Sequence, residues 1–268
     1  MQLQLGDRSH DVTSRALIMG ILRHPSDPSS GHGEVRSLDH LHRQAEQLVA
    51  EGADVLDVGG PSPGAGAGVS EQEELDCVVP AVEALHQRFE VPLSCDTSRA
   101  SVARAAYGAG AVVANDRSGF ADPDYLAVAA AAGATVITTH VGVATVAEVA
   151  ASLAKRGRSA EAAGLPPTRI VIDAGLDLGK TWRQSIALLR GSSVLAGLGY
   201  PLCLSASNAT FLGTLLDLGT EERREASHAA HAIGVIGGCR ILRAHDVRGA
   251  RRVADVVAAL VGDEVSRG

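Results

Sequence analysis

The sequence predicts a (β/α)8 barrel, and three observations support this fold class. Short apolar runs recur eight times along the 268 residues. Each run is almost continuously apolar rather than alternating, as expected for parallel strands that are covered on both faces. A segment of helical composition follows each run, and eight such units in about 250 residues match this barrel. An open doubly wound sheet is the alternative, but the glycine-rich dinucleotide motif expected after its first strand is absent from the sequence.

The elements are expected in strict alternation along the chain. The strands are the apolar runs Ala16–Leu22, Asp54–Val58, Pro92–Thr97, Val112–Asp116, Thr135–His140, Arg169–Ala174, Pro201–Ser205 and Ile241–His245. The helices are the amphipathic segments Leu38–Glu51, Glu71–Arg88, Ser98–Ala109, Asp122–Ala132, Thr145–Ala163, Arg183–Leu198, Glu221–Ile236 and Ala250–Leu260. We therefore expect one domain over residues 1–268, with the barrel at 16–260, an N-terminal extension at 1–15 and a tail at 261–268.

Composition excludes several classes of protein. Hydrophobic residues make up 46% and charged residues 21%, which is too apolar for a disordered chain. A net charge of -7 and only three Phe, three Tyr and one Trp argue against a nucleic-acid partner. The N-terminus lacks the features of a secretion signal, and no run of 18 apolar residues suggests a membrane partner. We expect a cytoplasmic protein.

The four cysteines show no C-x-x-C spacing, so we expect small buried thiols instead of a metal or redox site. Cys95 immediately precedes Asp96 on an expected strand. Its side chain should therefore point away from that of Asp96 and into packing.

Two connections rich in Gly, Pro and Ser follow the first two strands. They span Arg23–Val35 and Gly59–Ser70. Both leave the C-terminal ends of strands, which is where such barrels carry their active sites. We expect them to act as active-site lids.

Polar side chains gather at the ends of the expected strands. They are Arg23, Asp57, Asp96, Thr97, Asn115, Asp116, His140, Asp173, Ser205, Ser207, Arg243, His245 and Asp246. Any one of them could simply cap a helix, but together they converge on one barrel mouth. The acidic residues favour a neutral or cationic ring or a metal ion, whereas Arg23, Arg243 and His245 favour an anion.

Six segments in the right order carry a resemblance to a known family. They are Ile18–Leu22, Glu51–Gly60, Ser94–Thr97, Asn115-Asp116, Asp173–Thr181 and Leu242–Val247. The chain resembles the dihydropteroate synthases from about residue 16 to residue 260. This family joins hydroxymethyl-dihydropterin diphosphate to p-aminobenzoate.

The resemblance implies roles for particular residues. Asp96, Asn115 and Asp173 match the residues that recognise the pterin edge, and Arg243 and His245 match those that hold the diphosphate. We expect Asp96, Arg243 and His245 to be catalytic. The rest of the expected substrate-binding set is Asp57, Lys180, Ser207, Asn208, His140 and Arg23. Without a ligand or ordered water, the buried pterin-edge groups should be unsatisfied.

The sequence also departs from the family pattern. Arg23 stands where the family has the Asn that binds Mg²⁺ and the diphosphate, so we expect no metal and no cofactor. Pro61–Gly66 replaces a loop that supplies a Thr and an Arg to the substrates. Asn208 and Ala209 replace an Arg and a Lys of the substrate wall. The anion corner should then rely on protein cations and not on Mg²⁺.

These departures favour a divergent dihydropteroate synthase-like enzyme of specialised metabolism. It would bind a flat, pterin-like heterocycle at the barrel mouth and transfer or eliminate a phosphate, diphosphate or similar group. The alternatives are an ordinary dihydropteroate synthase, a non-catalytic ligand-binding or partner homologue, and a folate-binding methyl-transfer module. We further expect inefficient dihydropteroate synthesis. A homodimer is expected through the late helices within 183–198, 221–236 and 250–260.

Overall fold

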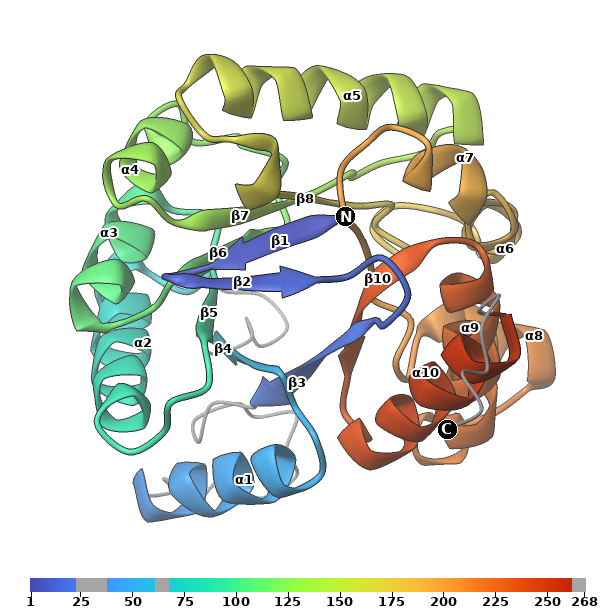
Figure 1. Ribbon diagram of the computed structural model, residues 1–268, viewed down its shortest axis with the longest axis horizontal. Helices are drawn as coiled ribbons and strands as arrows, with labels where there is room; N and C mark the ends of the chain where they lie inside the picture. The colour runs from blue at the N-terminus through green and yellow to red at the C-terminus, as the bar shows by residue number, and fades with distance from the viewer. Residues whose placement is uncertain (23–37, 61–67, 262–268) are drawn as a thin grey trace, which may run out of the picture.

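The computed structural model describes residues 1–22, 38–60 and 68–261, which form the predicted closed barrel (Figure 1). Its strands are β3 (Leu17–Leu22), β4 (Val55–Gly59), β5 (Leu93–Asp96), β6 (Val113–Asp116), β7 (Thr135–Thr139), β8 (Ile170–Asp173), β9 (Leu202–Leu204) and β10 (Cys239–Ala244). Neighbouring strands pair in parallel in chain order, and β10 closes the ring against β3. All eight predicted strands are confirmed, with ends that differ by two residues or fewer from the prediction.

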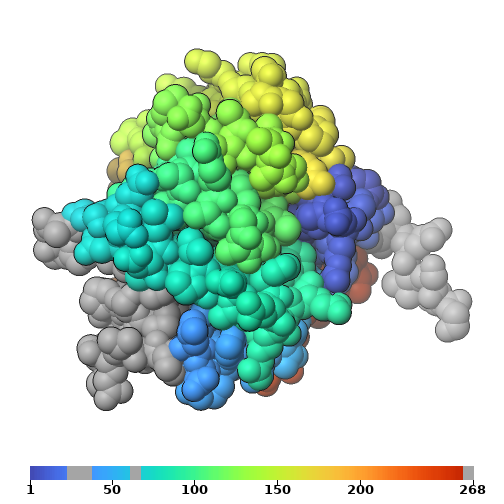
Figure 2. All heavy atoms as spheres, turned by 90° about the vertical axis from the view of Figure 1, so that its left-hand side faces the viewer, coloured from blue at the N-terminus to red at the C-terminus, as the bar shows by residue number. Residues whose placement is uncertain are grey.

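Helices cover the outside of this barrel (Figure 1), and the face seen in Figure 2 is formed mainly by segments coloured cyan to green. They are α1 (Leu38–Ala50), α2 (Glu71–His86), α3 (Ala100–Ala109), α4 (Tyr125–Ala131), α5 (Val146–Ala162), α6 (Trp182–Arg190), α7 (Ser192–Ala196), α8 (Thr210–Leu216), α9 (Arg224–Ile236) and α10 (Val247–Val261). Short 3-10 turns lie at Pro167–Arg169 and Thr220–Glu222. Among the described residues, no helix is both long enough and apolar enough to cross a membrane.

The alternation of side chains along each strand determines what reaches the barrel mouth. Val55, Val113 and Ile241 belong to the cluster that fills the barrel interior. Their neighbours Leu56 and Leu242 instead join the larger cluster between the strands and the helices. Since side chains alternate with a period of two, the residue two positions after each interior residue also faces inward, one layer nearer the mouth.

The N-terminal segment forms a β-hairpin that the sequence did not predict. β1 (Gln2–Leu5) pairs antiparallel with β2 (Arg8–Asp11) through a turn in which Gly6 has a φ of 59°. Leu3 and Leu5 are buried in the interior cluster of the barrel. The hairpin therefore closes the barrel at the end opposite the C-terminal ends of the strands (Figure 1).

Two other differences concern the late helices. The helix predicted over 183–198 is interrupted at Gly191, where a Cβ atom would lie 2.9 Å from Val146 Cγ1. This close approach of α5 favours glycine at that position and a break between α6 and α7. Helix α8 was not predicted, since its seven residues directly follow a polar loop.

Candidate active site at the barrel mouth

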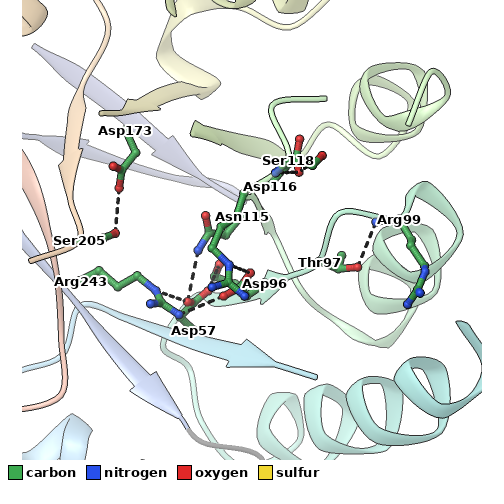
Figure 3. A network of polar contacts seen from close by, with 12 residues as sticks. Asp57, Asp96, Thr97, Arg99, Asn115, Asp116, Ser118, Asp173, Ser205 and Arg243 are labelled. Atoms are coloured by element: carbon green, nitrogen blue, oxygen red, sulfur yellow. Dashed lines mark hydrogen bonds and ion pairs between the residues drawn. The ribbon is translucent and has the colours of Figure 1, made fainter. Parts of the chain in front are cut away.

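Four polar side chains from four strands meet inside the mouth. Asp57, Asp96 and Asn115 come from β4, β5 and β6, and Arg243 comes from β10 (Figure 3). Three of them, Asp57, Asn115 and Arg243, stand two positions after an interior residue of their own strand. Asp96 pairs in register with Asn115 on the neighbouring strand. The alternation of side chains therefore turns all four inward. The sequence placed these residues together, and the structure confirms that they meet.

Asp57 is the centre of this network. Its side chain is completely buried and accepts hydrogen bonds from Ser94 Oγ at 2.6 Å and Asn115 Nδ2 at 3.4 Å. Arg243 Nε donates to Oδ2, the oxygen that also accepts from Asn115, at 2.7 Å, whereas Ser94 donates to Oδ1. A buried charge is stable only when it is paired and hydrogen-bonded, and Asp57 has both kinds of partner.

Asp96 lies between two guanidinium groups. Arg243 Nη2 donates to Oδ2 at 3.1 Å, and Arg117 Nε donates to Oδ1 at 2.9 Å. Burial raises the pKa of Asp96 above its ordinary value, and the two arginines oppose that rise. For Arg243, burial works to lower the pKa, but Asp57 and Asp96 raise it above its ordinary value. The cation is therefore firmly held between the two carboxylates.

Asp173 is placed apart from this network, at the end of β8 (Figure 3). It accepts hydrogen bonds from Gly175 N at 2.7 Å and Ser205 Oγ at 2.8 Å. Burial raises its pKa above the ordinary value, and these hydrogen bonds act in the opposite direction. The hydrogen-bond partners of Asp173 at the mouth therefore carry no charge.

The expectation that Asp96, Asn115 and Asp173 would be unsatisfied without a ligand is wrong. Each has a protein partner, because Arg117, Arg243 and the Asp57 and Ser205 side chains reach them. Arg243 was expected to bind an anion, but in the structure its guanidinium group donates to the carboxylates of Asp57 and Asp96. A ligand at this mouth must exchange hydrogen bonds with the protein instead of filling vacant ones.

Lys180 and His140 lie together beside the end of β7. Lys180 Nζ donates to the carbonyl oxygens of His140 at 3.0 Å, Gly175 at 2.8 Å and Leu178 at 3.4 Å. Burial lowers the pKa of Lys180 to about 8 and that of His140 below its ordinary value. The ammonium group thus holds the loop after β8, and a substrate-binding role for either residue remains a prediction.

Ser207 and His245 are joined across the ends of β9 and β10. Ser207 Oγ lies 3.0 Å from His245 Nδ1 and accepts a hydrogen bond from His245 N at 3.1 Å. Asn208 adopts a left-handed conformation with a φ of 56°, and its N–H donates to Ser227 Oγ at 2.9 Å. Ser207, Asn208 and His245 therefore lie close together, where the loops after β9 and β10 meet.

A polar cavity of about 300 Å³ lies beside this junction. The residues around it are Ser207, Asn208, Thr220, Glu221, Arg224, Ser227, His228, His231, His245 and Asp246. His231 is 1% exposed, and neither of its ring nitrogens has a hydrogen-bond partner in the described part of the chain. Burial, with a smaller contribution from His228, lowers the pKa of His231 to about 4. The imidazole is therefore neutral at neutral pH.

Some strand-end residues shape the loops instead of facing the mouth. Asp116 is fully buried and accepts hydrogen bonds from Ser118 N at 2.7 Å and from Phe120 N. Thr97 Oγ1 accepts from Arg99 N at 3.2 Å. Cys95 packs in the outer cluster, and burial raises its pKa, so the prediction that it points away from Asp96 is confirmed.

Part of the predicted site lies outside the described residues. The whole connection 23–35, with Arg23, and the segment 61–67 belong to this part, so their expected roles remain predictions. Within residues 1–22, 38–60 and 68–261, no group of three His, Cys, Asp or Glu side chains could hold a metal ion.

Arg117 is a site residue that the sequence analysis missed. It follows β6 directly, its side chain is 57% exposed, and it reaches Asp96 on the neighbouring strand. Strand alternation does not predict this contact, because a long side chain beyond the strand end can turn either way. The signal available was a cation two residues after Asn115 in a loop at the mouth.

Comparisons with known proteins identify the family of the chain. A family model described as "Pterin binding enzyme" matches residues 19–245. Dihydropteroate synthase from Bacillus subtilis is 35% identical, covering 92% of this chain and 89% of that protein. "Inactive dihydropteroate synthase 2" from Mycobacterium leprae is 36% identical, covering 94% and 92%.

Solved structures give the same result. Yersinia pestis dihydropteroate synthase with a sulfonamide drug has a TM-score of 0.90 at 32% identity, covering 97% of this chain and 99% of that one. A Coxiella burnetii dihydropteroate synthase in complex with pteroic acid has a TM-score of 0.88 at 29% identity, with coverage of 98% and 100%. The resemblance read from the six sequence segments is confirmed.

Proposed function

The chain belongs to the pterin-binding enzyme family, with dihydropteroate synthases among its relatives, and we propose that it binds a pterin edge-on and acts as a transferase of dihydropteroate synthase type. The observation that carries this proposal is the position of Asp96, Asn115 and Asp173. They come from three strands, face one barrel mouth and match the family's pterin-edge residues.

The chemistry of these side chains suits a pterin. Its 2-amino group and ring nitrogens present donors and acceptors along one edge, and two carboxylates and an amide are complementary to such a pattern. A hydrogen bond to a charged group contributes about 1.5–3 kcal/mol. A bound pterin would replace contacts that Asp96 makes with Arg117 and Arg243, so the net gain at this residue is smaller than the gross value.

The reaction proposed is that of the relatives. The bond between the pterin methylene carbon and the diphosphate oxygen breaks, and the amine nitrogen of p-aminobenzoate bonds to that carbon and loses a proton. Positive charge develops on the methylene as diphosphate leaves. Asp96, with Asp57 behind it, supplies negative charge to stabilise this state.

Between ordinary and specialised chemistry, the relatives favour the ordinary reaction. Several of the matched relatives are named dihydropteroate synthase. No observation in the described residues supports a different transferred group. We therefore place the specialised reaction, which the sequence departures favoured, below ordinary dihydropteroate synthesis.

A second candidate is a homologue that binds pterin without synthesising dihydropteroate. Asn208 and Ala209 leave the β9 side of the mouth without the two cations that the family pattern supplies. One relative of 36% identity is itself named inactive. Losing cations that pair with a carboxylated substrate weakens binding by roughly a thousandfold or more.

For the leaving group, we propose recognition by protein cations without Mg²⁺. Position 23 carries a guanidinium, which has no lone pair to offer a metal ion. Diphosphate affinity should accordingly not depend on Mg²⁺, and calorimetry with and without the metal tests this. A steep rise in affinity with Mg²⁺ would reject it.

Steady-state turnover with hydroxymethyl-dihydropterin diphosphate and p-aminobenzoate separates the two candidates. The synthase proposal expects diphosphate and dihydropteroate in equal amounts, at rates of about 1–10³ s⁻¹, and growth of a strain that lacks its own synthase. Pterin binding without product would support the non-catalytic homologue. Absence of both would refute the proposed function.

The late helices support a proposed homodimer. Ile233 and Ile236 on α9 are 48% and 63% exposed, and Val256 and Leu260 on α10 are 57% and 79% exposed. Exposed apolar side chains on adjoining helices are typical of an interface. Light scattering at micromolar concentration should give twice the chain mass, and Ile236→Glu should reduce it. A monomeric wild type would contradict this.

A further inference from the structure

Arg117 is not matched by any role that the family resemblance assigns, yet it touches the carboxylate at the centre of the proposed pterin site. Its Nε lies 2.9 Å from Asp96 Oδ1. The side chain is 57% exposed, whereas that of Asp96 is 6% exposed. The contact thus joins a group at the rim of the mouth to one buried inside it.

The two arginines on Asp96 are held with very different strength. Arg243 is 17% exposed and is fixed by a second carboxylate, Asp57, at 2.7 Å. Among the described residues, Arg117 makes one ion pair, to Asp96, and more than half of its side chain is exposed to solvent. A solvated pair contributes little, because water and salt screen it, while a buried pair is strongly coupled. Arg117 is therefore the partner that a ligand can displace.

The backbone of Arg117 stays in place when its side chain moves. The neighbouring Asp116 is buried and fixes the turn through hydrogen bonds from Ser118 N and Phe120 N. A displaced guanidinium would therefore swing about a fixed Cα and remain over the mouth. Oδ2 of Asp96 would still be held by Arg243, so only Oδ1 becomes available.

We propose that Arg117 is a specificity-determining residue that occupies Asp96 in the free protein and, once a pterin takes its place, binds an anionic substituent of the ligand. This proposal rests on the proposed function, because it requires the pterin edge to pair with Asp96. The ligand class that it selects is a pterin carrying a phosphate or diphosphate group.

Arg117 should lower the affinity for a neutral pterin and raise the affinity for a pterin diphosphate. A neutral pterin must displace the guanidinium from Asp96 and gains nothing from it afterwards. A pterin diphosphate displaces the same contact but then receives a charge-assisted, potentially bidentate pair from the released guanidinium.

The test is calorimetric titration of 6-hydroxymethylpterin and of its diphosphate into the wild type, Arg117→Gln and Arg8→Gln. Arg8 is the matched control, because its side chain is also 57% exposed and also donates to a carboxylate, Glu90, at 3.4 Å, but it lies on the hairpin at the opposite end of the barrel. Neither substitution should lower Tm appreciably, since both side chains are exposed.

The inference expects Arg117→Gln to bind 6-hydroxymethylpterin roughly two- to fivefold more tightly than the wild type. It expects the same variant to bind the diphosphate roughly tenfold or more weakly. The loss for the diphosphate should shrink in high salt, because exposed charges are screened. Arg8→Gln should leave the ratio of the two affinities unchanged.

Two results would overturn the inference. Either both affinities change in the same direction in Arg117→Gln, or their ratio changes equally in Arg8→Gln. In both cases the wild type still binds pterin, so the proposed function survives. If the wild type binds neither ligand, the proposed function fails and this inference fails with it.

Discussion

Two sides of the barrel mouth handle buried polar groups in different ways. On the arginine-bridged side, which comprises Asp57, Asp96, Asn115 and Arg243, buried charges neutralise one another. On the histidine-lined side, formed by the cavity around Ser207, His228, His231 and His245, a buried imidazole has no hydrogen-bond partner among the described residues and stays neutral.

The difference indicates what each side can do. Charges held by fixed partners keep their positions before a ligand arrives, which suits a site that must recognise a rigid ring. A cavity whose buried imidazole has unpaired ring nitrogens imposes less geometry on what enters it. We therefore propose that the arginine-bridged side carries the pterin specificity.

The largest effect should follow from removing the bridging cation. Arg243→Met leaves Asp57 and Asp96 buried without their shared partner, so the free energy of unfolding should fall by about 3–5 kcal/mol. Urea unfolding at pH 7 measures this. Arg252→Met on the exposed surface of α10 is the control and should change little. A loss in Arg243→Met no greater than in this control would show that the two carboxylates do not depend on the bridge.

A somewhat smaller effect is expected on the histidine-lined side. The folded protein holds the pKa of His231 at about 4, below the ordinary value of about 6.5. The unfolded chain therefore binds a proton first, and stability that is complete above pH 6.5 is lost as the pH falls toward 4. Over that whole range the loss is about 3 kcal/mol.

His231→Phe removes this titration, and the adjoining cavity offers room for the larger ring. The difference in unfolding free energy between variant and wild type, measured from pH 7.5 to 5, should shift in favour of the variant as the pH falls. His42→Asn on α1 provides the comparison at a half-buried histidine elsewhere. Parallel pH profiles for His231→Phe and the wild type would contradict the buried neutral imidazole.

Adding a cation to the histidine-lined side should change the affinity for pterin diphosphate by about tenfold. Ala209 has φ -61° and ψ 144°, which a lysine adopts without strain. Ala209→Lys should tighten pterin diphosphate binding by roughly tenfold, or about 1.4 kcal/mol. Ala209→Met, of similar length but uncharged, separates charge from contact area. Equal gains in both variants would exclude an electrostatic origin.

The variant Asn208→Arg, which would restore the second cation of the family pattern, is a less direct test of the missing charge. Asn208 has a φ of 56°, in the left-handed region, where most side chains other than Gly, Asn and Asp lose roughly 1–2 kcal/mol. The single change at Ala209 is therefore the cleaner test of the missing charge. The same strain explains why an asparagine suits this loop.

Much of the fold could be predicted because continuous apolar runs mark parallel strands. All eight barrel strands were found in this way. The hairpin over Gln2–Asp11 was missed, because its strands have four residues each and only Leu3 and Leu5 mark an apolar face. Such short strands gain stability from the barrel that they close, which local sequence does not reveal.

The site was predictable to the extent that strand alternation determines it. Asp57, Asn115 and Asp173 were placed at the mouth because a strand end and a two-residue period fix their direction. The alternation does not determine hydrogen-bond partners. The Arg117 contact and the capture of Lys180 by three backbone carbonyls depend on long side chains that choose among several neighbours.

The most direct test of edge-on pterin binding is a calorimetric titration of 6-hydroxymethylpterin into the wild type and Asp173→Asn. Asp173 suits this test because its partners, Gly175 N and Ser205 Oγ, are uncharged, so its replacement leaves the arginine bridge intact. Asp217→Asn, at the exposed end of α8, is the control. We expect binding to the wild type and the control, and a loss of at least about tenfold in Asp173→Asn. Equal affinity in all three proteins would contradict the assignment of the pterin edge to this mouth.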